Sequence, residues 1–231
     1  MKKTIILSVV MAFSSSIFSE NTPSLKPAKG TVTTQVGMSL SSFNSNVMSM
    51  GLNGRYFVKD QLAVRLSLLI DNQKEVTNTA ENPNGTGGTG SFTTNNNGTM
   101  IMLGVEKHFN GTRRLSPYIG AEIGFGASAV KTEGVNSNNS VYIANYTENG
   151  HRKFSDFGVN TFLGFDYWVG EGIYVGVEYT FAAYISSKEK QSETTRKTNN
   201  NTVTTVNFEN SFSNLTTISA LPVFRLGWRF N

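Results

Sequence analysis

The sequence lacks cysteine altogether and has few charged residues, which make up 16% of its 231 positions. Without cysteine the fold uses no disulfide, and no lipid-modified cysteine anchors the chain. The low charge, together with five prolines and 22 glycines, is atypical of a disordered polyelectrolyte or a helical bundle. No apolar run after the first twenty residues approaches the roughly eighteen residues of a transmembrane helix. Any attachment to a membrane must therefore come from the fold itself.

The N-terminus has the pattern of a Sec-type signal peptide. Lys2 and Lys3 precede an apolar run, 5–13, which is followed by small polar residues, 14–19. That run is too short to cross a bilayer as a helix. We expect a signal peptide over 1–19, an N-terminal segment over 20–29 and one domain over 30–231. Removing the two lysines lowers the formal charge of +4 to +2, which weakens any case for binding nucleic acid.

The rest of the chain divides into segments of about ten residues with alternating polarity, the length of a bilayer-spanning strand. Eight such segments are expected: 31–41, 47–58, 62–71, 99–109, 117–130, 154–169, 173–185 and 216–230. Every second connection is a tight turn, namely 59–61, 110–114 and 170–172. The others, apart from the short 42–46, are long and rich in Asn, Thr, Ser and Gly: 72–98, 131–153 and 186–215. This segregation predicts an all-β fold, an eight-stranded antiparallel transmembrane β-barrel with short periplasmic turns and longer extracellular loops.

The two faces of the segments differ in chemistry. In 62–71, for example, Leu66 and Leu68 alternate with Arg65 and Ser67. A secreted barrel with an apolar ligand cavity would show the same period, so side-chain size decides the orientation. The interior of eight strands is only wide enough for side chains to fill, which suits glycines with a few long charged residues. A charge on the lipid face would cost about 2–4 kcal/mol near the midplane. We therefore assign the apolar face to lipid.

The inward face then holds matched numbers of basic and acidic side chains. They are Arg55, Arg65, Arg225 and Arg229, with Glu106, Glu122, Asp166 and Glu178, and His108 joins them near the lower turn. An unpaired buried charge is very costly, so this set predicts a paired polar network that plugs the lumen rather than a water-filled pore. Lys107 is assigned outward, beside the turn, where its amine reaches the interface.

Aromatic residues cluster where the strands meet the lower rim. They are Tyr56, Phe57, Phe109, Tyr167, Trp168, Tyr174, Trp228 and Phe230. This clustering predicts an interfacial girdle, in which we place Tyr56, Phe109, Tyr167, Trp228 and Phe230. Ordinary core aromatics are the alternative interpretation.

Three stretches resemble the family of small outer-membrane β-barrel proteins that includes OmpX, OmpW and the OmpA barrel domain. Residues 56–64 (YFVKDQLAV) look like the strand, tight turn, strand signature of that family, 117–121 (PYIGA) is similar to an upward strand, and 224–230 (FRLGWRF) to the closing strand. The resemblance implies that barrel-assembly machinery reads the final strand, although here Asn231 follows the terminal aromatic. The family implies no single activity, because its members include adhesins, structural barrels and small-molecule channels.

Candidate chemistry is sparse. The chain has two histidines, and only His151, near Arg152, Lys153 and Ser155, suggests a lipid-modifying Ser-His enzyme. The run Gly85 to Gly90 fits G-x-G-x-x-G, but no helix follows it, so it predicts a flexible loop tip. We therefore expect no enzyme, cofactor or metal site.

The last long loop retains strand propensity at 202–208, and with 188–196 it would continue the final hairpin above the membrane. A solvated, irregular loop is the alternative. We expect a protein of the bacterial outer membrane, exported through the Sec pathway, with a structural or surface-interaction role. Its partners would be outer-membrane lipid, the assembly machinery, and a protein bound by 72–98, 131–153 and 186–215. The alternatives are a narrow channel or lateral pathway for small or hydrophobic solutes, and a lipid-modifying enzyme.

Overall fold

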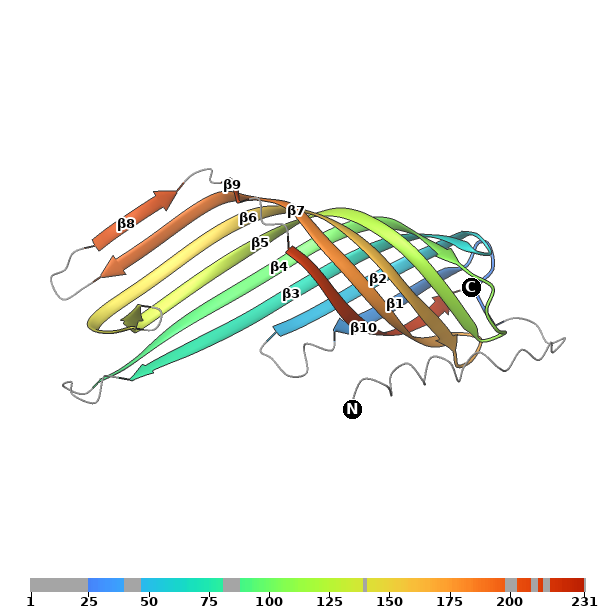
Figure 1. Ribbon diagram of the computed structural model, residues 1–231, viewed down its shortest axis with the longest axis horizontal. Coiled ribbons are helices and arrows are strands. Elements are labelled where there is room, and N and C mark those ends of the chain that lie inside the picture. Colours follow the sequence, from blue (N-terminus) through green and yellow to red (C-terminus); the bar gives the residue numbers. More distant parts are fainter. Residues whose placement is uncertain are drawn as a thin grey trace, which may run out of the picture.

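Figure 1 shows the computed structural model, in which residues 25–39, 47–80, 88–138, 141–197, 203–208, 212–213 and 217–230 are described. The expected signal peptide, 1–19, and the short connection 42–46 lie outside the described residues. Within the described ranges, no helix has the length and apolar character needed to cross a membrane.

Eight antiparallel strands form a closed ring. They are β1 (Val32–Ser39), β2 (Val47–Lys59), β3 (Leu62–Ala80), β4 (Thr89–His108), β5 (Leu115–Asn138), β6 (Val141–Trp168), β7 (Ile173–Lys197) and β10 (Thr217–Phe230). Each pairs with the next along the chain, and β10 closes the ring by pairing with both β7 and β1. The predicted eight-stranded antiparallel barrel is therefore confirmed. Two short strands, β8 (Val203–Phe208) and β9 (Phe212–Ser213), pair with β7 outside the ring.

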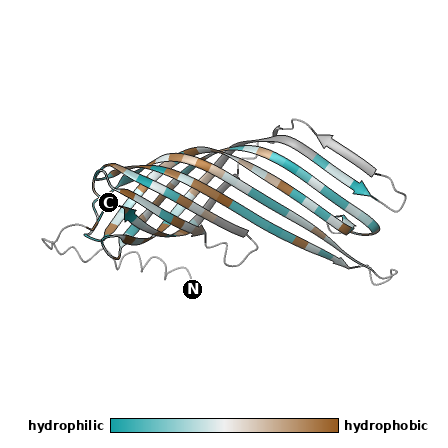
Figure 2. Cartoon of the chain, turned by 180° about the vertical axis from the view of Figure 1, so that it is seen from behind, coloured by the Kyte–Doolittle hydropathy of each residue, from teal (hydrophilic) through white to brown (hydrophobic). Residues whose placement is uncertain are grey.

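The side chains of the barrel alternate as expected. Leu66 is 55% exposed on the outside, whereas the neighbouring Arg65 is 3% exposed inside. Of the exposed large apolar side chains described, all but Val76, Val135 and Val141 lie on the barrel rather than beyond it. Figure 2 shows the same division, with brown concentrated on the barrel and teal along the projecting strands. Exposed apolar groups in such a band match a hydrocarbon surrounding.

The long connections are different from the expectation. Residues 72–80 and 89–98 continue β3 and β4 as one paired ladder up to Ala80 opposite Thr89. Residues 131–138 and 141–153 likewise continue β5 and β6. The prediction of long loops over 72–98 and 131–153 is therefore wrong for most of their length. Alternation detects a strand only where its two faces meet different surroundings, and these segments have polar residues on both faces.

The expected continuation of the final hairpin is present. β7 runs to Lys197, and β8 pairs with it from Ser192 opposite Phe208 to Lys197 opposite Val203. Thr89 and Gly90, expected in a loop tip, instead begin β4 and pair with β3, while 81–87 lie outside the described residues.

We call the projecting part the distal sheet. It begins at the row of paired residues Asn72, Asn97, Ala129, Lys153 and Gln191, and it ends with β8. β6 has 28 residues, more than twice the roughly 9–11 that a bilayer-spanning strand needs. Register shifts between Lys153 and Phe154 and between Phe157 and Gly158 lie where β6 and β7 leave the barrel. Such bulges bend a strand pair, and in Figure 1 the distal sheet leaves the barrel as a long open layer.

Candidate functional site

Arg65 lies at the centre of the barrel interior. Its Nη1 is 2.8 Å from Oε2 of Glu178 and 3.2 Å from Oε1 of Glu106, and its Nε is 3.4 Å from Oε2 of Glu122. The guanidinium also lies 4.3 Å from the centre of the Phe162 ring. One buried cation thus meets three carboxylates that come from three other strands of the wall, as planar guanidinium groups do well.

Arg55 links the lower part of the cluster. Its Nη1 is 2.8 Å from Oδ2 of Asp166 and 3.1 Å from Oε2 of Glu106. His108 approaches the same Glu106 carboxylate at 3.2 Å through Nε2, while its Nδ1 lies 2.9 Å from Oγ of Ser116. All five side chains are buried, so the lower cluster joins residues of β2, β4, β5 and β6 across the lumen.

Arg225 closes the network from the last strand. Its Nη1 contacts Oε2 of Glu178 at 2.5 Å and also the hydroxyl of Tyr118. The Tyr118 hydroxyl in turn donates to Glu178 at 3.0 Å. Glu178 lies on β7, the neighbour of β10, whereas Tyr118 lies on β5, so the contact with Tyr118 ties the closing strand to a strand across the lumen.

Neutral polar side chains complete the network, and the sequence analysis did not single them out. Asn160 donates to Oε1 of Glu122 at 2.9 Å, and Ser67 donates to its Oε2 at 2.7 Å. The Asn53 amide oxygen accepts from Arg65 at 3.1 Å. Their position on the inward side of the alternation was the available signal, because Asn53 and Ser67 each lie two residues from a charged member along the strand.

Arg229 is the expected member that remains outside the ion-pair network. It is only half-buried, its Nη1 donates to the backbone oxygen of Leu25 at 3.4 Å, and its guanidinium lies 5.8 Å from the Trp168 ring centre. Three arginines, not four, therefore face the four carboxylates and His108.

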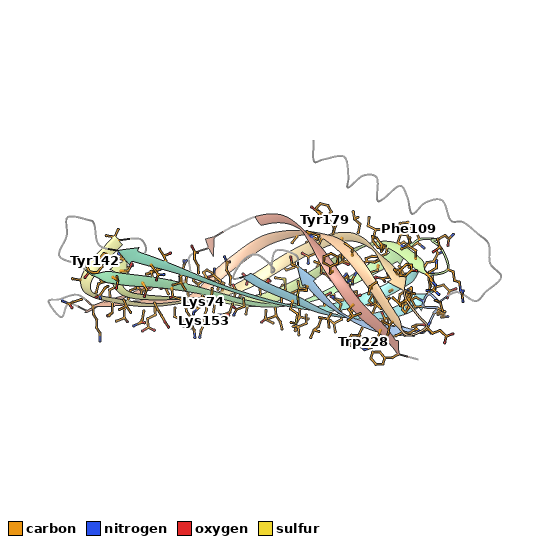
Figure 3. All side chains as sticks on the ribbon, turned by 90° about the horizontal axis from the view of Figure 1, so that it is seen from below. Lys74, Phe109, Tyr142, Lys153, Tyr179 and Trp228 are labelled. Atoms are coloured by element: carbon orange, nitrogen blue, oxygen red, sulfur yellow. The ribbon has the colours of Figure 1, made fainter. Side chains whose placement is uncertain are left out.

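Three aromatic residues of the lower-rim cluster point the other way. Phe57, Trp168 and Tyr174 are fully buried, and the last two pack with Leu25 at the lower end of the lumen. These three belong to the aromatic cluster that was expected to form the girdle, and that expectation is wrong for them. Alternation accounts for the difference, since Trp168 and Tyr174 have the same parity as Asp166 and Glu178 on their strands. The other five, Tyr56, Phe109, Tyr167, Trp228 and Phe230, are exposed on the outside, and Figure 3 shows Phe109 and Trp228 at this end. Lys107 is also exposed, with its amine 3.2 Å from Oε1 of Gln61.

Glycines in the wall make room for this interior. Gly104 lies opposite both Arg65 and Glu122 in the register. A Cβ on Gly104 would come within 2.4 Å of the Ala121 carbonyl oxygen and 2.5 Å of the Glu122 Cβ. Absence of a side chain there lets strands β4 and β5 approach while long charged groups fill the lumen.

The distal sheet has a smaller polar cluster. Arg196 on β7 pairs with Glu148 on β6 through Nε and Oε2 at 3.1 Å, and the Tyr146 hydroxyl donates to the same carboxylate. Burial and this hydrogen bond to Glu148 raise the pKa of Tyr146 to about 12. These contacts fasten the ends of β6 and β7 to each other.

His151 is not arranged for hydrolysis. It pairs across the sheet with Lys131 and Glu193, whereas Ser155 lies four residues along the strand, or roughly 13 Å away. A base must reach its nucleophile within a hydrogen bond or through one water. Within the described ranges, no group of three or more metal-ligating side chains is arranged to hold a metal ion.

Comparison with known proteins gives one family match and several similar folds. Residues 36–230 match the model described as "Putative OmpA-OmpF-like porin family". A search of curated proteins gives no match. Similar solved structures include the N-terminal β-barrel domain of Pseudomonas aeruginosa OprF, at 13% identity and TM-score 0.43, covering 88% of this chain and 100% of that one.

Two further structures are comparable. P. aeruginosa OprG has 10% identity and TM-score 0.48, covering 90% of this chain and 99% of its own. A major outer membrane protein from Thermus thermophilus has 8% identity and TM-score 0.49, covering 87% and 99%. The family match extends over nearly the whole barrel and the distal sheet. The chain therefore belongs to this OmpA-like family of outer-membrane β-barrel proteins.

Proposed function

We propose that the protein is a closed membrane anchor that presents the distal sheet outside the cell as an interaction surface. The observation that carries this proposal is the continuity of the β3–β7 ladders, which extend from the barrel wall into the distal sheet without a break in pairing between neighbours apart from local bulges. A scaffold of this kind holds a binding surface rigidly above the membrane.

The filled lumen supports an anchor rather than a pore. Arg55 pairs with Asp166, Arg65 with Glu178 and Arg225 with Glu106 across the interior, and all three arginines are at most 3% exposed. Opening a water path there would separate buried ion pairs, and an uncompensated buried charge is strongly destabilising. We therefore expect purified protein in planar bilayers to give no stable current, next to a general porin reconstituted as a positive control. Discrete, reproducible openings of the wild-type protein would contradict the closed-anchor proposal.

The free edges of the distal sheet suit a protein partner. β2 pairs with β3 only as far as Gln73, so Lys74 to Ala80 face no described strand on that side. An edge strand with unpaired backbone groups is a template for strand addition. Because the chain has no cysteine, single cysteines report contacts cleanly. We expect Asn78→Cys on the edge strand to cross-link to a partner in intact cells, and Asn149→Cys, on the doubly paired β6, not to. Equal labelling of both positions would argue against edge recognition.

A lateral pathway for small hydrophobic solutes is the second candidate. The described pairing of β1 with β10 runs to Ser39 opposite Val223, residues 40–46 lie outside the described residues, and β10 pairs with β7 as far as Thr217. Pro222 lies in this part of β10 and has no N–H to donate. Uptake of an apolar fluorescent solute into proteoliposomes tests it. Uptake by the wild type that is lost when Pro222→Val closes the wall would favour this route over the closed anchor.

We also propose export through the Sec pathway and insertion by the barrel-assembly machinery. The lysine-led apolar run near the N-terminus and the alternating final strand with its terminal aromatic support this route. Accumulation of a longer precursor when Sec translocation is inhibited, with residues 1–19 still attached, is the expected result. Normal maturation under that inhibition would contradict it.

A further inference from the structure

A group of lysines lies on the outward face of the strands, just beyond the apolar band. Lys74, Lys131 and Lys153 are exposed, and each shares the outward parity of an exposed apolar residue on its own strand, namely Ile70, Phe125 and Leu163. Lys74 and Lys131 flank Asn95 in one row across the sheet, and Lys153 lies in the next outward-facing row toward the barrel. Figure 3 shows Lys74 and Lys153 at the same level along the molecule, between Trp228 at the barrel end and Tyr142 at the far tip.

A hollow lies beside Lys153. It has a volume of about 410 Å³, and its outward side chains are Asn97, Thr99, Ala127, Ala129 and Lys153. Ala127 and Ala129 leave a depression on β5 because the residues paired with them on β4 and β6 have longer side chains. The hollow is therefore a recess lined by small side chains, with the amine of Lys153 and the amide of Asn97 at its polar edge.

The height of this surface matches the headgroup layer of a membrane. Lys74 follows the exposed Ile70 by four residues, and Lys153 is four residues from Phe157, or about 13 Å in each case. The Phe125 and Phe157 rings pack 5.0 Å apart below the hollow. A lipid standing beside the barrel would place its chains along these rings and its headgroup at the lysines.

Charge distinguishes the two faces of the distal sheet. The outward face has Lys74, Lys131, Lys153 and Lys197 against Glu133 and Glu193, whereas the inward face has Arg152 and Arg196 against Glu75 and Glu148. Among the residues that the structure describes, no carboxylate lies within ion-pair distance of Lys74, Lys131 or Lys153. The excess of basic groups is thus on the side that continues the lipid-facing wall of the barrel beyond its apolar band.

We propose that this surface binds the headgroup phosphates of a phosphorylated lipid in the outer leaflet, with Lys153 at the hollow and Lys131 and Lys74 beside it. Amines attract an anionic headgroup, and the recess admits its polar ring or phosphate against the strand backbone. The site shares Lys74 with the edge segment that we assign to a protein partner, but it uses the outward-facing side chain, whereas strand addition uses the backbone groups of that edge.

Native mass spectrometry of the full chain in zwitterionic micelles tests the proposal, with lipid A carrying two phosphates as the probe. The Lys74→Ser, Lys131→Ser, Lys153→Ser triple variant is expected to bind about 100-fold more weakly, since each lysine near an anionic surface contributes roughly a five-fold factor. The matched control removes Lys29, Lys59 and Lys107 at the opposite rim, where all three are exposed, and should bind as the wild type does. Replacing the same three lysines of the site by arginine keeps the charge and should also preserve binding.

Three outcomes would overturn the proposal. The first is unchanged binding by the serine variant, with the heat-modifiable band of a folded barrel retained. The second is equal binding of lipid A from which both phosphates have been removed, which would assign the site to acyl chains. The third is displacement of the lipid by inorganic phosphate at an equal concentration, which would make a free anion the ligand.

Discussion

The barrel and the distal sheet are built from the same strands but are held together in opposite ways. In the barrel, alternate residues meet lipid and a closed ionic interior, as with Leu66 and Arg65 on β3. In the distal sheet, the continuation of β3 from Asn72 to Asn78 is exposed or half-buried on both faces, although its ladder with β4 is unbroken. Backbone pairing is therefore common to the two regions, while a continuous buried interior is present in the barrel and the distal sheet buries only a few side chains, among them Tyr146 and Glu148.

This difference predicts where substitutions are costly. Removing Arg65 from the interior leaves the buried Glu122 without its ion pair and takes one cation from Glu106 and Glu178, which retain Arg55 and Arg225. Removing Arg196 from the distal sheet removes a side chain that is 48% exposed, and its partner Glu148, which is 7% exposed, keeps the hydrogen bond from Tyr146. Pairs of substitutions with the same chemistry in the two regions therefore test the comparison directly.

The largest effect is expected for Arg65→Met. It preserves apolar bulk but leaves three carboxylates around one missing cation, and losing one partner of a buried pair costs about 3–5 kcal/mol. Urea unfolding of the protein in lipid vesicles, followed by tryptophan fluorescence, measures it, because both tryptophans of the chain, Trp168 and Trp228, are in the barrel.

The matched substitution in the distal sheet is Arg196→Met. Its ion pair with Glu148 has the same chemistry, but the Arg196 side chain is 48% exposed. Exposed pairs contribute about 0–1 kcal/mol, so the barrel should unfold at almost the same urea concentration. A loss as large as that of Arg65→Met would show that the distal sheet and the barrel unfold as one cooperative unit.

An effect between those of Arg65→Met and Arg196→Met is expected from Gly104→Ala. The new methyl group would meet the backbone of β5, and forcing extra volume into a packed site typically costs about 1–3 kcal/mol. Gly98→Ala, six residues along the same strand, is the control, because its Cβ would meet Ser128 and Asp71 at ordinary distances of 3.8 and 3.9 Å. Equal stability of the two variants would mean that β4 and β5 can separate at Gly104 without disturbing the ionic cluster.

The sequence was a good guide to the barrel because two solvents act on its strands. Period-two alternation in 62–71 and 173–185 exists since lipid and the lumen select different side chains, and the eight segments correspond to the eight strands of the ring. The same rule failed at 131–153, where water contacts both faces and selects no period. Strand propensity detected the last hairpin at 203–208 because valine and threonine are frequent there.

At the site, parity identified the charged members but not their partners. Arg55, Arg65 and Arg225 were assigned inward from their strands alone, whereas the choice of Glu178 for both Arg65 and Arg225 depends on distances across the lumen. Arg229 has the inward parity too, yet it lies so near the lower end that it meets Trp168 and the backbone of Leu25 instead. Depth along the barrel axis is not encoded in alternation.

The smallest effect is expected from shortening the hairpin of β3 and β4. Replacing residues 77–92 with Asn-Gly joins Val76 and Thr93, which are paired, through a turn that favours two-residue hairpins. A simple deletion of 86–95 would instead shorten β4 alone and leave Lys74 to Ala80 of β3 without their partners on β4. Because the described residues of this range, 77–80 and 88–92, contribute no side chain to the ionic interior, the unfolding free energy of the barrel should change by no more than about 0.5 kcal/mol.

The control for this variant shortens the same ladder inside the barrel, by deleting the two opposed pairs formed by Ser67, Leu68, Ile101 and Met102. This deletion keeps the pairing between β3 and β4, but it moves every residue above the deleted pairs down the barrel by two positions. The shifted residues of β3 and β4 then no longer lie beside their former neighbours on β2 and β5. We expect this second variant to lose the heat-modifiable band, whereas the hairpin variant keeps it. If the hairpin variant also lost that band, the barrel would need the distal sheet in order to close its ring of strands. The view that the barrel folds independently and the distal sheet depends on it would then be wrong.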